Sequence, residues 1–462
     1  MNVVFCYHTT DYEFNFSIAL LSAALKPMHV NVSLVIFREI AGRPKDTLEE
    51  TVQRIMEKKP DMVAFSIMTF NWIKIQKVIT RLRRVFPSII VVGGCHAILC
   101  PDDVLAFPGV DAVCPGDGEK PLQELVGFCQ KHSMDSIPEI EGLRFKNSSS
   151  YNHVVPWCNE HLDAYPYLSF DIFDEERNQR LNQKITGMLS FAGIFSLPVI
   201  TSRGCPYKCA YCNNRSFMEI FGGPKRFLRS YPASKVVADI KYLVERYQPD
   251  SIEFMDEMFL KHDRWMYEFC DAYSEEIGLP YTVLLRIDRC KEEIVRLLVN
   301  SGLKLVFFGL ECGDETYRAK YLDRHMSNTD ILKGAELLRR YDIMIVTSNM
   351  FGLPYETPEM IEKTISLNRK LQPDAVAPFI YQPLPKTKLG QMALEQGLAQ
   401  PPPADQWDFL APSLNSRELP ATYVQKRVDA FLNEFNSPEK TMANISRIRL
   451  FCAGKPAAIA SA

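Results

Sequence analysis

Short apolar runs alternate with segments of helical periodicity along the first third of the chain. Segments such as KDTLEETVQRIMEKK and WIKIQKVITRLRRVF place apolar residues three and four positions apart, as amphipathic helices do. The runs between such segments have the length and near-continuous apolar character of buried strands, at residues 2–7, 30–37, 61–67, 88–94 and 110–117. This alternation predicts a parallel sheet covered on both faces, an open doubly wound, Rossmann-like domain over residues 1–135.

The same rhythm returns after Leu197. Residues 136–196 show weak periodicity and predict an irregular linker. Six strand candidates follow, separated by amphipathic segments, at residues 198–205, 251–259, 281–288, 304–313, 343–354 and 375–385. Six βα units in succession predict an α/β partial (β/α)6 TIM barrel over residues 197–395, with functional groups at the carboxyl ends of its strands. Residues 396–462 open with a proline-rich stretch and then predict a small helical region.

Composition and charge narrow the class of protein. With 462 residues, 47% of them hydrophobic, the chain can bury sizeable cores. Its formal charge of −3, with both signs interspersed, offers no broad basic surface, so we expect no nucleic-acid partner. The N-terminus lacks the pattern of a secretory signal, and the longest apolar run, GMLSFAGIFSLPVI, is shorter than the roughly 20 residues that cross a bilayer. We therefore expect a soluble, cytoplasmic protein without a membrane partner.

The stretch TSRGCPYKCAYCNN places Cys205, Cys209 and Cys212 close together. Three thiolates from one loop are typical ligands of an iron–sulfur cluster, and they leave one iron open to an exogenous ligand. Zinc would require a fourth Cys or His at short spacing, but the nearest downstream histidine is His262. Three ordinary thiols in a loop are the remaining alternative.

This motif, with an aromatic residue, Tyr211, directly before the last cysteine, resembles that of the radical S-adenosylmethionine (SAM) superfamily. The resemblance implies a [4Fe-4S] cluster held by Cys205, Cys209 and Cys212, with SAM on the open iron. It also implies reductive cleavage of SAM to a 5′-deoxyadenosyl radical, an external electron donor of flavodoxin or ferredoxin type, and a small-molecule substrate.

Later strand ends resemble further cofactor-binding segments of this family. The resemblance places Asp256 and Glu257 (FMDEMF) near the SAM amino group, Arg286 and Asp288 (LLRID) towards cofactor or substrate, Glu311 (FFGLECGDE) at the ribose or methionyl part, and Gly352 (MFGLPYET) against the adenine. A single carboxylate is more often a solvated surface group. Their position at successive strand ends of one barrel supports the functional interpretation.

The first domain resembles the cobalamin (B12)-binding domain that precedes this catalytic domain in one large subgroup. The matching residues follow the third, fourth and fifth strands: Ser66, Thr69, Gly93, Gly94, His96, Gly116 and Glu119. Glycines alone are also explained by turns. The Asp-x-His-x-x-Gly signature that supplies a cobalt-ligating histidine in mutase-type domains is absent. Cobalamin would then bind without a protein histidine, or the domain would keep the fold without it.

The leading hypothesis is an oxygen-sensitive enzyme in which cobalamin sits between the domains and delivers a methyl group to an unactivated carbon. The runner-up is a cobalamin-free radical dehydration, epimerisation, cyclisation or oxidation with a vestigial first domain. Either needs a residue that handles a proton or hydrogen atom. The candidates are Cys312, Tyr381 and Glu257.

Three other interpretations are disfavoured. A cobalamin or metal sensor would not need the complete barrel, and a methylthiolase of transfer RNA would carry other flanking domains. A second cluster site at Cys95, Cys100, Cys114 and Cys158 lacks ferredoxin-like spacing. Substrate identity and oligomeric state are left open by the sequence.

Overall fold

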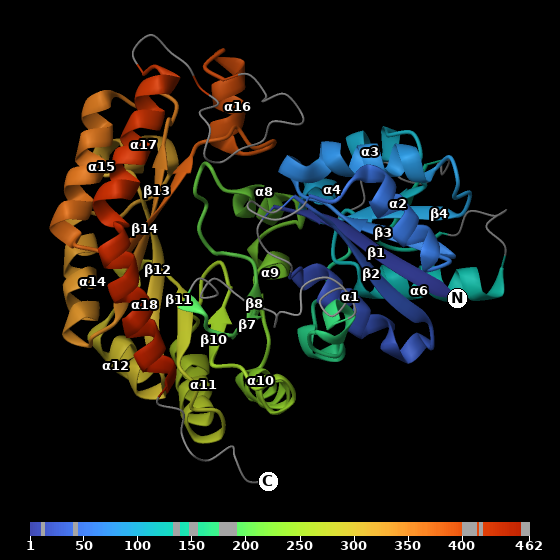
Figure 1. The fold of residues 1–462 in the computed structure, drawn as a ribbon, viewed down its shortest axis with the longest axis horizontal. Coiled ribbons are helices and arrows are strands. Elements are labelled where there is room, and N and C mark those ends of the chain that lie inside the picture. Colours follow the sequence, from blue (N-terminus) through green and yellow to red (C-terminus); the bar gives the residue numbers. More distant parts are fainter. Residues whose placement is uncertain are drawn as a thin grey trace. The chain divides into compact units, whose positions relative to one another are not determined.

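The computed structural model describes residues 1–10, 14–39, 45–132, 139–146, 156–174, 192–399, 414 and 419–453. These residues form two compact units, shown in Figure 1. The first holds the described part of residues 1–185 together with Ser216–Phe227, and the second holds the other described residues. Much of the predicted linker, and the proline-rich start of the C-terminal region, lie outside the described residues.

The first unit is built on a six-stranded sheet with the order β2-β1-β3-β4-β5-β6. Its strands are β1 (Asn2–Thr9), β2 (Asn31–Arg38), β3 (Met62–Ser66), β4 (Ile89–Gly93), β5 (Ala112–Val113) and β6 (Arg144–Phe145). The five predicted strands are present and pair in parallel, whereas the short β6 adds an antiparallel edge. This order reverses its winding direction at β1 and β3, and doubly wound sheets bind ligands at such a switch point.

Helices cover both faces of this sheet. They are α1 (Phe16–Leu25), α2 (Leu48–Glu57), α3 (Trp72–Leu82), α4 (Cys95–Leu99), α5 (Pro101–Ala106) and α6 (Glu119–Lys131). The helices α1 and α6 contact each other on one face, and α2 and α3 contact each other on the opposite face (Figure 1). Thr47 and Glu50 form a capping box that satisfies the free N–H groups at the start of α2.

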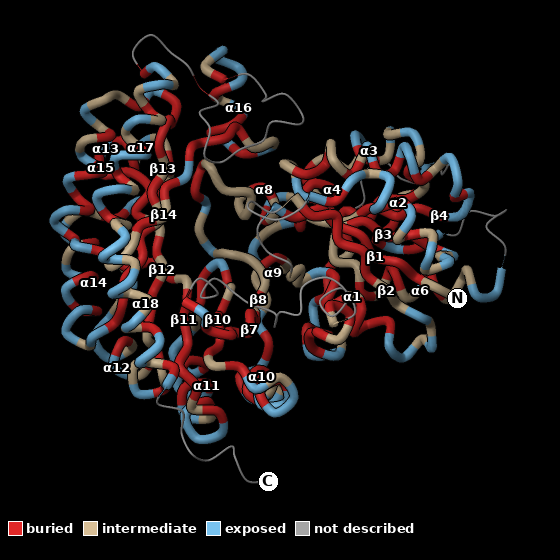
Figure 2. The backbone as a smooth tube through the Cα atoms, viewed as in Figure 1, coloured by how far each residue is buried: buried red, intermediate tan, exposed pale blue. Residues whose placement is uncertain are grey.

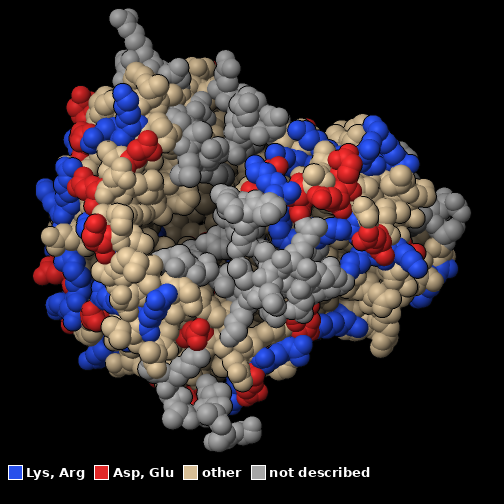
Figure 3. Space-filling model, in the orientation of Figure 1, with Lys and Arg blue, Asp and Glu red and all other residues tan. Residues whose placement is uncertain are grey.

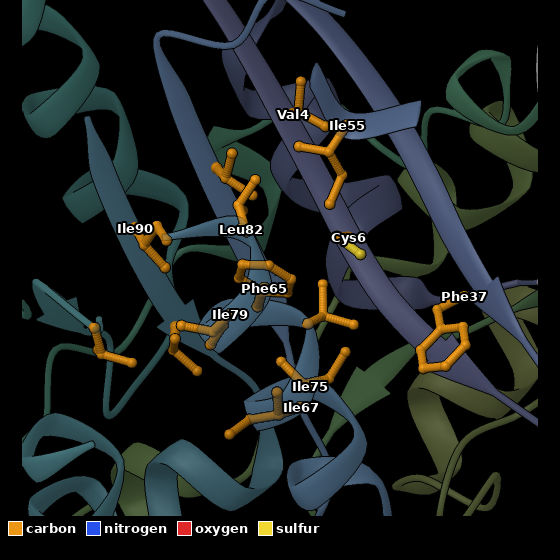
Figure 4. Packing of buried hydrophobic residues seen from close by; sticks show 14 of the residues in the cluster. Val4, Cys6, Phe37, Ile55, Phe65, Ile67, Ile75, Ile79, Leu82 and Ile90 are labelled. Carbon is orange, nitrogen blue, oxygen red and sulfur yellow. The ribbon is translucent and has the colours of Figure 1, made fainter. Parts of the chain in front are cut away.

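The core between the sheet and α2 and α3 is built from the side chains that these helices turn inward. Figure 4 shows Val4 and Cys6 of β1 beside Ile55 of α2, with Ile75 and Ile79 of α3 over the neighbouring strands. All five side chains are fully buried. The three-to-four-residue apolar spacing seen in the sequence therefore marks the faces that pack on the sheet.

The second unit contains a six-stranded parallel sheet with the order β14-β13-β12-β11-β10-β7. Its strands are β7 (Ser196–Val199), β10 (Ser251–Phe254), β11 (Tyr281–Leu284), β12 (Leu303–Glu311), β13 (Met344–Phe351) and β14 (Ala375–Ile380). Intervening helices are α10 (Ala233–Tyr247), α11 (Asp263–Glu276), α12 (Glu292–Ser301), α13 (Glu315–Leu322), α14 (Asn328–Arg340) and α15 (Pro358–Leu371). The six predicted barrel strands are thus confirmed, in sequential order, and all pair in parallel.

Two C-terminal helices complete this unit. The helix α17 (Ala421–Phe435) packs on the outer face of β14, next to α15. The helix α18 (Pro438–Ala453) crosses the amino ends of the strands, where Arg447 contacts Asp342 and Asp374. Its Ile448 and Cys452 pack against residues of β12 and β13 and so cover the sheet near the amino ends of these strands.

Burial and charge follow this layering. Within each unit the strands are buried and the outward helix faces are exposed (Figure 2). On the face shown in Figure 3, acidic and basic side chains of the described residues are interspersed. None of the helices in the described ranges combines the length and apolarity needed to cross a membrane.

Candidate functional site

The loop between β8 (Ser202–Arg203) and α8 (Asn213–Ile220) carries the three motif cysteines. Gly204 opens the loop with a φ of +88°, a left-handed conformation that residues with a Cβ rarely adopt. Cys209 is buried, whereas Cys205 and Cys212 are half-buried. The backbone N–H of Cys212 donates to the carbonyl oxygen of Cys209 at 3.2 Å, which closes a tight turn between two of the thiols.

The three thiols fit a cluster better than a single metal ion. Burial raises the pKa of Cys205 and raises that of Cys212 to about 12, so both groups stay protonated thiols unless a bound metal displaces the proton. No three metal-ligating side chains among the described residues lie close enough to share one ion. In an iron–sulfur cluster each cysteine binds a different iron, so the three thiols need not converge on one ion. The donor set therefore fits a cluster with one open iron.

Glu311 lies at the end of β12, next to this loop. It has a φ of +65° at a register shift in the strand, and a Cβ added to Gly309 would lie 2.0 Å from its Oε1. The Tyr211 hydroxyl donates to Glu311 Oε1 at 3.0 Å. Burial raises the pKa of the Glu311 carboxyl, and the Arg324 guanidinium opposes that rise. This hydrogen bond joins the cysteine loop, through Tyr211, to the carboxyl end of β12, through Glu311.

Asp256 and Glu257, at the end of β10, have different environments. Asp256 is fully buried and accepts hydrogen bonds from Thr201, Ser202 and Lys261. These bonds hold in place the residues that lead into the cysteine loop. The Asp256 oxygens therefore already have hydrogen-bond donors within the protein. Glu257 is exposed. The pKa of its carboxyl is nevertheless raised, because the surrounding protein limits its hydration and Asp256 adds a like charge.

Arg286 and Asp288 form a pair that holds the cysteine loop. The Arg286 Nε and Nη2 donate to the two Asp288 carboxylate oxygens at 2.9 and 3.0 Å. The guanidinium lies over the ring of Tyr207, 4.0 Å from its centroid. The sequence predicted a pair facing cofactor or substrate, and the structure adds this contact with the loop itself.

The end of β13 is organised by a buried carboxyl that the sequence reasoning missed. Gly352, with a φ of +69°, and Leu353 donate their N–H groups to Glu356 Oε2 at 2.7 and 3.1 Å. The other oxygen, Oε1, has no hydrogen-bond partner in the described part of the chain. Burial raises the pKa of Glu356 to about 8. Its place in GLPYET, four residues after the strand-end Gly352, was the available signal.

Cys312 and Tyr381, two of the catalytic candidates, lie inside one packed hydrophobic cluster. Cys312 is fully buried and Tyr381 nearly so. Burial raises the pKa of Cys312 to about 12 and that of Tyr381 above its ordinary value. Of the three candidates, Glu257 is the one that the described structure leaves open to solvent.

One face of the sheet near its carboxyl end is only partly covered. Strand pairing sets these residues on the same face, which we call the inner face: Phe307, Gly309, Ser348, Met350, Ala377 and Phe379. They are half-buried or exposed, with Phe379 at 43%. The alternate residues of β13 and β14 pack against helices and are buried. The inner face carries no charged side chain, and the sequence reasoning missed it.

In the first unit, the polar candidates gather at the carboxyl ends of β3 and β4. The Thr69 hydroxyl and His96 Nδ1 are 3.1 Å apart, and Asn15 Nδ2 donates to the Ser66 hydroxyl at 3.3 Å. Burial lowers the pKa of His96 to about 4, so its ring is neutral at pH 7. These side chains flank the switch point of the sheet.

The glycines beside them allow the backbone to pack closely. Gly94 has a φ of +102°, and an added Cβ would lie 2.6 Å from the Ile67 carbonyl oxygen. A Cβ on Gly116 would lie 2.4 Å from the carbonyl oxygen of Trp157. Gly93 meets only ordinary contacts. Glu119, buried, begins α6. The predicted cobalamin side of this sheet is therefore lined by backbone, by the neutral ring of His96 and by hydroxyl groups, with the Glu119 carboxyl at the start of α6.

Comparison with family descriptions gives two matches on separate parts of the chain. Residues 199–367 match the radical SAM superfamily. Residues 9–126 match the B12 binding domain. The first match contains the cysteine loop and strands β10 to β13, and the second begins at the end of β1 and contains β2 to β5.

Individual relatives are similar at low identity. An uncharacterized methyltransferase of Pyrococcus horikoshii is 24% identical over 364 residues, which is 78% of this chain and 75% of that protein. An anaerobic magnesium-protoporphyrin IX monomethyl ester cyclase of Cereibacter sphaeroides is 24% identical over 75% of this chain, but the match spans only 55% of the cyclase.

A solved structure shares the fold. The radical SAM methyltransferase TsrM of Kitasatospora setae, with cobalamin and a [4Fe-4S] cluster bound, superposes with a TM-score of 0.64 at 17% identity. The superposition covers 87% of this chain and 76% of TsrM. At this identity the likeness shows a common fold.

Proposed function

Because the chain belongs to the radical SAM superfamily and carries a B12-binding domain, we propose that it is a cobalamin-dependent methyltransferase acting on an unactivated carbon of a small molecule. When bound, the reduced [4Fe-4S] cluster supplies the electron that cleaves SAM, and cobalamin carries the transferred methyl group. The thirteen cysteines lack the spacing of a secreted disulfide scaffold, which agrees with a reducing, cytoplasmic setting. The proposal includes an external flavodoxin- or ferredoxin-type electron donor.

The observation that carries this proposal is the cysteine loop at the start of the barrel. Cys205, Cys209 and Cys212 offer three thiolates, and the described residues nearby provide no fourth ligand of a single-ion site. One iron would stay open for the amino and carboxylate groups of SAM. The hydrogen bond from Tyr211 holds the Glu311 carboxyl beside that loop, where the carboxyl can accept hydrogen bonds from a SAM hydroxyl or ammonium group.

The inner face favours an uncharged methyl acceptor. Phe307, Met350 and Phe379 supply apolar surface, and Ser348 and Ala377 are small, whereas the space over Gly309 is taken by the Glu311 carboxyl. Burying a charged group against such a surface is costly without a partner. Among the three predicted catalytic candidates, we propose Glu257 as the group that holds or moves a proton, because it is exposed and its carboxyl pKa is raised.

A second candidate function is a radical cyclisation or oxidation without methyl transfer. It is favoured by the 24% identity to the cyclase of Cereibacter sphaeroides. The two functions differ in what they consume. Methyl transfer produces S-adenosylhomocysteine as well as 5′-deoxyadenosine, whereas the second candidate needs only the radical.

The test begins with anaerobic purification, reconstitution with iron and sulfide, and loading with hydroxocobalamin. After removal of unbound corrinoid, the visible spectrum is recorded, and SAM carrying a labelled methyl group is added with dithionite. Retained corrinoid bands, 5′-deoxyadenosine and transfer of label to the corrinoid would support the proposal. Deoxyadenosine without retained corrinoid would reject methyl transfer and favour the second candidate.

A further inference from the structure

A four-residue segment at the end of α13, Leu322–His325, lies against the cysteine loop. Each of its residues makes a contact with the loop or with a side chain packed on it. The contacts are Ala210 N–H to Leu322 O at 2.9 Å, Arg215 Nη1 to Asp323 Oδ2 at 2.8 Å, Arg324 Nη1 to Cys209 Sγ at 3.7 Å, and Arg286 Nη2, stacked on Tyr207, to His325 O at 3.3 Å. We call this segment the bracket.

Arg324 is the member of the bracket that reaches a cluster ligand directly. Its side chain is buried, with 6% of the residue exposed. Nη2 donates to the carbonyl oxygen of Gly309, Nη1 donates to the Cys209 sulfur, and Nε has no partner among the described residues. A buried guanidinium is costly unless anions face it. Glu311 is such a group, and Cys209 becomes another when its thiol is deprotonated.

A cation and an N–H donor at a ligand sulfur have a defined effect on an iron–sulfur cluster. The reduction potential depends on the net charge near the cluster, on hydrogen bonds to its sulfurs and on solvent exposure. Adding an electron makes the cluster more negative, so a fixed positive charge favours the reduced state. The Arg324 to Cys209 contact combines the positive charge and the hydrogen bond in a site that excludes most water.

We propose that Arg324 is a positioning residue that holds the Cys209 thiolate for iron and raises the reduction potential of the cluster. This inference requires the cluster, which the superfamily implies, and is independent of methyl transfer. It also gives the buried charge a role beyond its interaction with Glu311: the charge makes the cluster easier for its electron donor to reduce.

The test is a potentiometric titration of the full-length, reconstituted protein followed by electron paramagnetic resonance. Dithionite supplies one electron to convert the 2+ cluster to the 1+ cluster, with neither SAM nor cobalamin present. We expect R324Q to move the midpoint to a more negative potential, so that the reduced fraction at a fixed applied potential falls several-fold. R324K, which keeps the charge, should lie between R324Q and the wild type.

Arg289 provides the matched control. It is an exposed arginine near the same loop, where its Nε donates to the Tyr207 hydroxyl at 3.0 Å, and within the described residues it contacts Tyr207 and not a cysteine sulfur. R289Q should leave the midpoint unchanged. An unchanged midpoint in R324Q with full iron content would overturn the proposal. So would a change seen only after SAM is added, because it would assign Arg324 to SAM binding.

If R324Q takes up no iron, the proposal is tested by comparing the iron uptake and the apo-protein thermal stability of R324Q, R324K and the wild type. Iron uptake restored by R324K, with equal thermal stability of all apo proteins, would support the holding role. A fall in apo stability shared by R324Q and R324K would assign Arg324 to the fold and overturn the proposal. None of these readouts uses the methyl acceptor, so failure of the proposed function would not be confused with failure of this inference.

Discussion

The carboxyl ends of the two sheets are lined by different kinds of chemical group. In the second unit that edge is charged and tightly paired, with Asp256, Glu311 and Arg324 buried and hydrogen-bonded around the cysteine loop. In the first unit the corresponding edge is lined by backbone, by Gly94 and by a neutral His96. The difference indicates that a small, charged cofactor is held by fixed charges, whereas a bulky one needs room and backbone contacts.

The largest expected effect comes from removing a cluster ligand. In C209S, we expect iron to be lost and SAM cleavage to fall by at least about 100-fold, because changes to groups that merely support metal ligands already cost about 10–100-fold. Iron content, sulfide content and deoxyadenosine formation measure it. C129S, in α6 of the first unit, is the control and should behave like the wild type. Full iron content in C209S would contradict a three-cysteine cluster.

A single methyl group on Gly94 should destabilise the carboxyl end of the first unit's sheet. G94A would place a Cβ 2.6 Å from the Ile67 carbonyl oxygen and also strain a φ of +102°, so we expect a loss of about 4 kcal/mol in the free energy of unfolding and loss of corrinoid binding. Gly223 has a similar φ of +112° with nothing within 4 Å. G223A therefore measures the conformational cost alone. Equal denaturation midpoints for the two variants would show that the close contact does not matter.

Glu356 should make the second unit less stable as pH rises. Its carboxyl pKa is near 4.5 when unfolded and about 8 in the fold, so its contribution is complete below about 4.5 and is lost as pH rises through 8. The loss is on the order of 4 kcal/mol. E356Q removes this titration, and hydrogen exchange of Phe351–Thr357 at pH 6 and 8.5 measures it. The exposed E359Q is the control. A pH response retained in E356Q would refute the assignment.

His96 should give the first unit the opposite response. Its pKa is about 6.5 when unfolded and about 4 in the fold, so its stabilisation is present above pH 6.5 and is lost as pH falls through 4. The expected loss is about 3 kcal/mol. Hydrogen exchange of β3 and β4 in apo protein at pH 7 and 4.5 measures it. H96Q should flatten the response and the exposed H132Q should not; an equally acid-sensitive H96Q would exclude His96 as the cause.

The strands and the main helices could be predicted because their apolar periodicity is strong and local. Two-residue strands such as β6 are too short to show a period. The inner face could not be predicted from the sequence for a related reason. Strands that are apolar on both faces lack the alternation that would show which face a helix covers, so Phe379 resembles any other buried aromatic residue.

The site was predictable only as far as residue type indicates chemistry. Three cysteines in one loop point to metal whatever surrounds them, and the fold places them as expected at the start of the barrel. Two of the donors to Asp256, Thr201 and Ser202, lie about 55 residues earlier in the chain, so the hydrogen bonds that occupy its oxygens could not be predicted from FMDEMF. Arg324 is missed for the same reason: its sulfur contact spans 115 positions.

The helix α18 makes the C-terminal region part of the barrel's own core. Its Ile448 and Cys452 pack with Leu305 of β12 and with Met344 and Val346 of β13. Removing α18 would therefore expose apolar side chains of two central strands to water. The last described helix is thus a structural component of the second unit and not an appendage to it.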